Sequence, residues 1–114
     1  MNKDAKSMKT ADPKLLQDIV ARVTAAVHPS RIILFGSAAR GELGRNSDLD
    51  ILVIMPEEIH RRRTAQTVFR ALRGIGTPKD IVVVTERDVV DYGENPSFVL
   101  KPALAEGRLL YAAG

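Results

Sequence analysis

Apolar residues recur at helical spacing in two segments of the chain. The first segment opens with Asp12 and Pro13, a pair typical of a helix N-cap followed by proline in the first turn. Its apolar residues then recur at helical spacing and share one helix face: Leu16, Ile19, Val20, Val23 and Val27. The second segment, residues 58–73, places Ala65, Val68, Phe69 and Leu72 on one face and is followed by Gly74 and Gly76, which are expected to end it. The pattern predicts two amphipathic helices.

Short apolar runs between these segments predict strands. RIILF at 31–35 and KDIVVVT at 79–85 are rich in β-branched residues and too short for helices. SDLDILVIM at 47–55 has the same character and is closed by Pro56. GRLLYA at 107–112 is expected to form a last strand.

The order of these elements predicts the fold class. Residues 86–106 are expected to form one or two short helices, broken near the GENP sequence and at Pro102. Helices and strands that alternate in this way are typical of an α/β domain, here with a small mixed sheet of three to four strands flanked by helices. The link between the first two strands is short, which permits them to pair antiparallel.

Length and composition narrow the class of protein. A chain of 114 residues suffices for one core, so we expect a flexible N-terminus over residues 1–11 and a single domain over 12–114. The absence of cysteine excludes disulfides and thiolate zinc sites. No apolar run approaches the ~20 residues of a membrane span, and Asp18 and Arg22 interrupt any secretory signal. A soluble cytoplasmic protein is therefore expected. The net charge of +3 does not by itself indicate a class of binding partner.

Two aspartates at the start of the second strand are candidate metal ligands. Side chains in a strand alternate between faces, so Asp48 and Asp50 project from the same side. Two carboxylates that close repel each other unless a cation lies between them. Asp80 opens the next strand and would complete a three-acid cluster if the strands are neighbours. Oxygen ligands favour magnesium or manganese, and such a cluster can hold two ions ~3.5–4 Å apart.

Each aspartate also has a purely structural interpretation. Asp48 could cap a turn, Asp50 could lie at a solvated strand edge, and Asp80 could be a polar residue where its strand begins. An ionised side chain within the LDILVI run is nevertheless costly to desolvate unless it is paired, and this cost favours the metal interpretation.

A glycine–serine pair before the aspartates is a candidate phosphate site. Gly36 allows the backbone to approach a ligand closely, and amides at the start of a following short helix favour phosphate oxygens. The Ser37 hydroxyl can donate to the same oxygens, and Arg40 can add positive charge. The alternatives are that Ser37 is a helix N-cap and Arg40 a solvated side chain.

This arrangement resembles a known signature. The sequence FGS is followed, after ten residues, by DLD. This spacing resembles the GS-x10-D-x-D signature of the polymerase-beta-like nucleotidyltransferase superfamily. Together with ARG and SDLDILV, residues 32–55 are similar to the minimal nucleotidyltransferases, or MNT proteins, which are commonly paired with HEPN-domain proteins. The strand that starts at Asp80 corresponds to the one bearing the family's third acid.

The resemblance implies an activity and a partner. Asp48 and Asp50 would ligate two magnesium ions, Asp80 would ligate the catalytic metal and help activate a hydroxyl, and manganese could replace magnesium. Gly36 and Ser37 would bind the β- and γ-phosphates with help from Arg40. The activity implied is transfer of AMP from ATP to a tyrosine of a HEPN ribonuclease toxin, which makes this chain the antitoxin.

Other functions stay open from the sequence. The chain could be an antitoxin that masks its partner without catalysis, or a transferase that acts on a small molecule or an RNA end. A helical partner protein or a second copy of the chain would supply the surface that larger relatives build from a second domain. The basic HRRR run at 60–63 is expected to be a solvated helix face and not a nucleic-acid surface, because no aromatic residues accompany it.

Overall fold

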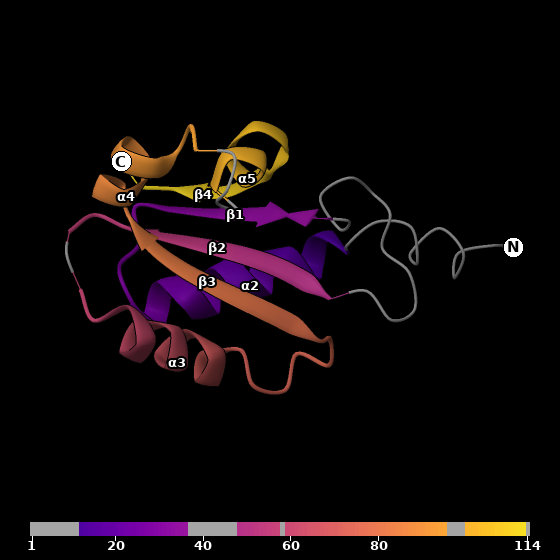
Figure 1. The fold of residues 1–114 in the computed structure, drawn as a ribbon. Coiled ribbons are helices and arrows are strands. Elements are labelled where there is room, and N and C mark those ends of the chain that lie inside the picture. The colour runs from indigo at the N-terminus through magenta and orange to yellow at the C-terminus, as the bar shows by residue number, and fades with distance from the viewer. Residues whose placement is uncertain (1–11, 37–47, 58, 96–99, 114) are drawn as a thin grey trace, which may run out of the picture.

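The computed structural model describes residues 12–36, 48–57, 59–95 and 100–113. The expected flexible N-terminus, residues 1–11, lies outside this part. Along the described chain the elements are α2 (Pro13–Ala26), β1 (Arg31–Phe35), β2 (Leu49–Met55), α3 (Arg61–Ala71), β3 (Lys79–Thr85), α4 (Glu86–Tyr92), α5 (Leu100–Glu106) and β4 (Arg108–Ala112) (Figure 1). None of the helices in these ranges has the length and apolar character needed to cross a bilayer.

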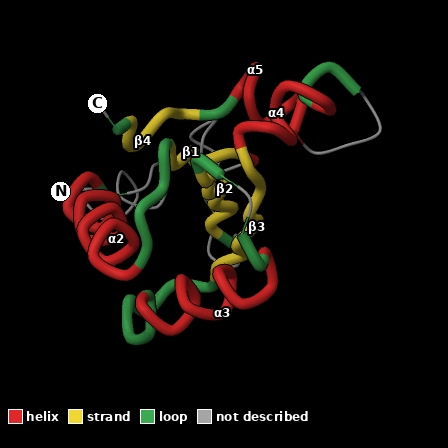
Figure 2. Tube along the Cα trace, turned by 90° about the vertical axis from the view of Figure 1, so that its left-hand side faces the viewer, coloured by secondary structure: helices red, strands yellow, loops and turns green. Residues whose placement is uncertain are grey.

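The four described strands form one mixed sheet in the order β3-β2-β1-β4. β1 pairs antiparallel with β2 and with β4, and β2 pairs parallel with β3. The α/β class and the small mixed sheet of three to four strands are thus confirmed, and the first two strands adopt the antiparallel pairing that their short link permits. In Figure 2, α2 and α3 lie on one side of the sheet, and α4 and α5 lie on the other.

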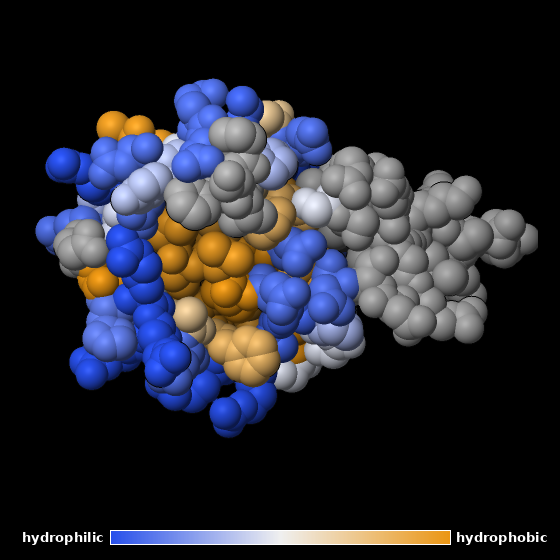
Figure 3. All heavy atoms as spheres, viewed as in Figure 1, coloured by the Kyte–Doolittle hydropathy of each residue, from blue (hydrophilic) through white to orange (hydrophobic). Residues whose placement is uncertain are grey.

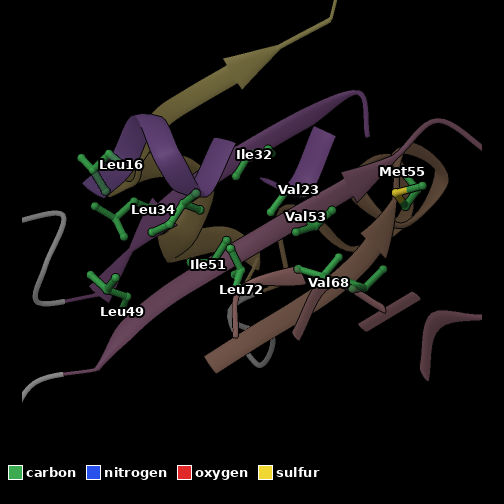
Figure 4. Close-up of a cluster of buried hydrophobic side chains, with 12 residues drawn as sticks. Leu16, Val23, Ile32, Leu34, Leu49, Ile51, Val53, Met55, Val68 and Leu72 are labelled. Atoms are coloured by element: carbon green, nitrogen blue, oxygen red, sulfur yellow. The ribbon is translucent and has the colours of Figure 1, made fainter. Parts of the chain in front are cut away.

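The central strand β2 is buried on both faces. Leu49, Ile51, Val53 and Met55 pack with α2 and α3 in one apolar cluster (Figure 4). The alternate residues Leu52 and Ile54 pack with α5 in a second cluster. A strand covered on both sides needs apolar residues at successive positions, which explains the unbroken ILVIM run. Asp50 belongs by alternation to the α5 face, which is also the face of Leu52.

The helix ends follow from local capping groups. The Asp12 side chain accepts a hydrogen bond of 2.9 Å from the Lys14 amide, so the predicted start of α2 is confirmed. The predicted start of α3 at residue 58 is wrong. The helix begins at Arg61, because His60 is the N-cap and its Nδ1 accepts a hydrogen bond of 3.1 Å from the Arg63 amide.

The helices differ from the sequence expectation at two residues. Phe69, placed by its spacing on the apolar face of α3, is nevertheless 52% exposed, and the ammonium of Lys79 lies 4.6 Å from the centre of its ring. Pro102 does not break a helix. It lies in the first turn of α5, where backbone amides have no partner within the helix and proline is tolerated.

Candidate active site

The described carboxylates of the candidate site meet at the beginning of β2 and β3. The parallel register places Asp50 opposite Asp80 and Leu52 opposite Val82. Both aspartates therefore belong to the same face of the sheet, on neighbouring strands whose backbones lie about 4.8 Å apart. The expectation that Asp80 neighbours the Asp48–Asp50 strand is confirmed.

Asp50 is the electrostatic centre of this group. Its carboxyl is half-buried, and burial raises its pKa above the ordinary value of 3.8. The negative charges of Asp80 and then of Asp48 raise the pKa of Asp50 further. Asp48 is exposed and precedes β2 by one residue, while Asp80 is exposed on the edge strand. The three acidic groups thus act on one another, and each added negative charge makes the ionised form of Asp50 less favourable.

The donor chemistry of these groups fits a hard divalent cation. Carboxylate oxygens are the ligands preferred by magnesium and manganese, and a bound cation would relieve the repulsion at Asp50. Within the described ranges, no three acidic or histidine side chains are clustered closely enough to enclose an ion by themselves. A cation held here would therefore be shared with other oxygen donors, such as the phosphates of a nucleotide.

Gly36 brings the backbone against the Asp50 carboxylate. Its φ of +75° lies in the left-handed region that glycine adopts readily. A Cβ at this position would strike Oδ2 of Asp50 and would lie 3.2 Å from its Cγ. The contact arises because Phe35, the residue before Gly36, pairs with Asp50 in the antiparallel register of β1 and β2. Glycine at position 36 is therefore required by both its φ and its neighbour.

Ser37 and Arg40, the remaining predicted phosphate ligands, lie outside the described residues and stay predictions. The close approach of Gly36 to Asp50 was not foreseen from the sequence, which suggested only an approach to phosphate. Its signal was available in the antiparallel pairing of two strands joined by a short link.

The candidate carboxylates lie outside the cavities that the described residues line. Three cavities of about 360, 540 and 220 Å³ occur elsewhere, beside β4, beside β3 and near the start of β1, and none of them is lined by Asp48, Asp50 or Asp80.

Comparison with known proteins gives a family match. The model of the family described as "Nucleotidyltransferase domain" matches residues 14–106, which include the described carboxylates and Gly36. No curated protein matches the chain.

Solved structures share the fold. A candidate nucleotidyltransferase from Sulfolobus solfataricus is 24% identical with a TM-score of 0.60, over 87% of this chain and 78% of that chain. A toxin–antitoxin complex with AMP-PNP is also 24% identical, with a TM-score of 0.58 over 86% of this chain and 73% of that chain. A complex of a tri-AMPylated Shewanella oneidensis HEPN toxin with MNT antitoxin is 19% identical. Its TM-score is 0.53, over 88% of this chain and 71% of that chain.

Proposed function

Because this chain belongs to the family of nucleotidyltransferase domains, we propose that it transfers AMP from ATP to a hydroxyl group of a partner protein. The observation that carries the proposal is the register of the parallel pair β2–β3, in which Asp50 lies opposite Asp80 on one face. Gly36 lies against the same Asp50 carboxylate. Acidic groups on adjacent strands beside a glycine turn suit a polyphosphate and its cations.

Asp48, Asp50 and Asp80 are the residues that we assign to magnesium, two ions in all, with manganese as a substitute. Bound there, the ions would neutralise negative charge on the transferring phosphoryl group. The raised pKa of Asp50 supports this assignment, because a cation would offset the repulsion from Asp80 and Asp48.

The remaining steps belong to groups of the chain itself. Asp80 accepts the proton of the acceptor hydroxyl as its oxygen attacks the α-phosphorus of ATP. The bond from that phosphorus to the bridging oxygen of the β-phosphate then breaks, and pyrophosphate leaves. In this proposal Ser37 and the backbone at Gly36 hold the β- and γ-phosphates, and Arg40 adds positive charge beside them.

The proposed acceptor is a HEPN-domain toxin, which would make this chain the antitoxin of a cytoplasmic toxin–antitoxin pair. Support comes from similar structures in which an MNT antitoxin is bound to a HEPN toxin, in one case tri-AMPylated. The exposure of Asp48 and Asp80 also suits an acceptor presented by another protein. A steric antitoxin, and a transferase for a small molecule or an RNA end, are the alternatives that the experiment must exclude.

Intact-mass spectrometry tests the proposal directly. The chain is mixed with its HEPN partner, ATP and magnesium, and the partner is expected to gain one or more AMP units. Asp50→Asn and Asp80→Asn should abolish the gain, since each removes a charge assigned to the cations. Asp91→Asn is the matched control: Asp91 lies on α4, where its carboxylate pairs with Arg87 at 3.2 Å, and its loss should leave transfer intact.

Three results would contradict the proposal. Neutralisation of the toxin that survives Asp50→Asn would indicate masking without catalysis. Transfer to RNA or to a small hydroxyl compound, with none to the partner, would indicate a different acceptor class. Transfer that persists in EDTA would exclude a role for divalent cations. Parallel reactions with CTP, GTP and UTP would identify the base.

A further inference from the structure

The outer edge of β3 is open. Among the described strands β3 pairs with β2 alone, so its second edge has no strand beside it (Figure 1). Every second residue of an edge strand turns its amide and carbonyl toward the open side, which makes the edge a template for another strand. Soluble proteins usually protect such edges with charge, proline or a bulge. The Ile81–Thr85 part of β3 reads IVVVT and carries no charge and no proline, and its register with β2 is uninterrupted.

A groove runs beside this edge, between β3 and α3. It is a cavity of about 540 Å³. Its apolar lining comes from Ala65 and Phe69 of α3 and from Ile81 of β3, and Phe69 is 52% exposed. Figure 3 shows an apolar area in the middle of this side of the molecule, bordered by hydrophilic residues. An exposed apolar surface with a polar rim is typical of an interaction site.

The rim of the groove is cationic. Arg62, Arg70 and Arg73 line it, together with Gln66, and no acidic residue of the described ranges does. None of these three arginines forms an ion pair with a carboxylate of the described residues, whereas the adjacent Arg61 pairs with Asp88 at 2.8 Å. The groove therefore presents positive charge that the described part of the chain does not neutralise.

We propose that this groove and edge bind an extended acidic segment of a partner protein, which adds to β3 as a further strand. Its alternate side chains would face α3, with apolar ones on Ala65, Phe69 and Ile81 and carboxylates near the arginines. The surface is separate from the carboxylates proposed for catalysis, because Ile81 and Asp80 belong to opposite faces of β3. The inference therefore does not depend on nucleotidyl transfer.

Charge and shape argue against the other occupants. A second copy pairing through its own β3 would bring the same arginines toward each other, and like charges across an interface are unfavourable. RNA would satisfy the arginines, but binding of single strands also uses exposed aromatic platforms. Among the described residues that line the groove, Phe69 is the only aromatic one.

Fluorescence anisotropy with synthetic probes tests the proposal. The probe is a labelled peptide with serine at every second position and with valine and glutamate taking turns at the positions between, so that both kinds of side chain face α3. We expect it to bind, while the counterpart with lysine in place of glutamate does not. An acidic peptide methylated at alternate backbone nitrogens should lose binding, because it cannot donate to β3. The double change Arg70→Glu with Arg73→Glu should weaken binding of the acidic peptide by about tenfold or more and create binding of the basic one.

Arg63→Glu is the matched control, because Arg63 lies on the same helix but not in the groove. It should leave the affinity for the acidic peptide unchanged. Hydrogen exchange should report protection of the Ile81–Val84 amides on binding. The proposal is overturned if the acidic peptide fails to bind, if the methylated peptide binds equally, or if Arg63→Glu weakens binding as much as the double change. Tighter binding of an RNA oligonucleotide, or self-association through β3, would equally overturn it.

Discussion

Replacing Gly36 by alanine should damage both the candidate site and the stability of the fold. The substitution adds one methyl group where the backbone has φ +75° and where the Asp50 carboxylate occupies the space that a Cβ needs. The carboxylate must therefore move or the turn must rearrange. Gly74 offers a matched comparison, since its φ is +89° and a Cβ there would meet nothing within 4 Å.

The two substitutions separate a backbone cost from a contact cost. Placing alanine in the left-handed region costs about 1–2 kcal/mol at either position. At Gly36 the collision with Asp50 adds about 1–3 kcal/mol, the usual range for forcing an extra group into occupied space. We therefore expect Gly74→Ala to destabilise by about 1–2 kcal/mol and Gly36→Ala by about 2–5 kcal/mol.

Denaturant unfolding and a nucleotide assay measure the two effects. The free energy of unfolding is obtained for each alanine variant, alone and combined with Asp50→Ala, which removes the obstructing carboxylate. In the Asp50→Ala background the cost of Gly36→Ala should fall to that of Gly74→Ala. Binding of manganese with a nonhydrolysable ATP analogue should be lost in Gly36→Ala and retained in Gly74→Ala.

Equal effects at the two glycines would refute the reasoning. If Gly36→Ala and Gly74→Ala lower stability by the same amount and leave nucleotide binding intact, the contact with Asp50 has no consequence. If the loss of unfolding free energy caused by Gly36→Ala is the same with and without Asp50→Ala, the loss comes from the left-handed backbone alone and not from the contact with Asp50.

Three further predictions concern single side chains. Asp50→Asn should raise the thermal midpoint in the absence of divalent cations, because the amide removes a charge whose burial, together with repulsion from Asp80 and Asp48, raises the pKa of Asp50; an unchanged or lower midpoint by calorimetry would contradict this. The hydrogen bond that Arg31 donates to Glu86 lowers the pKa of Glu86 below its ordinary 4.5. The ion pair therefore stabilises the folded state fully above pH 4.5, and this stabilisation is lost as the pH falls through the lower pKa that Glu86 has in the folded state. Glu86→Gln should thus cost up to about 1 kcal/mol at pH 7, given that the pair is partly exposed, and denaturant curves for the two proteins should converge in acid. Thr85→Ala should cost about 1 kcal/mol, because Thr85 and Asp88 form a capping box at α4, and Thr85→Ser should retain most of that stability in thermal melts.

The strands could be predicted from the sequence because burial dictates their composition. β2 is covered on both faces, so its apolar run has no polar interruption after Asp50, and KDIVVVT forms β3 over the whole of its length. The alternation rule then placed Asp80 beside Asp50 once the strands were taken as neighbours. These inferences succeed because they depend on local periodicity.

Features that depend on tertiary context could not be predicted in the same way. Phe69 has the spacing of a core residue, but β3 is an edge strand and leaves that side of α3 exposed. The start of α3 depends on the His60 side chain, which is not among the usual capping residues. The contact between Gly36 and Asp50 depends on the register of β1 against β2, which one residue of slippage would abolish. Ser37 and Arg40 stay predictions from the signature.

The pairing of β4 with β1 has a consequence for the order of assembly. Among the described strands, Arg108–Ala112 leaves the ribosome last, yet it pairs with β1, which is made first. Until it arrives, the inner strand β1 has a free edge that can associate with other nascent chains. Premature termination before residue 108 would therefore leave a three-stranded sheet with two open sides, a species suited to clearance by chaperones and proteases.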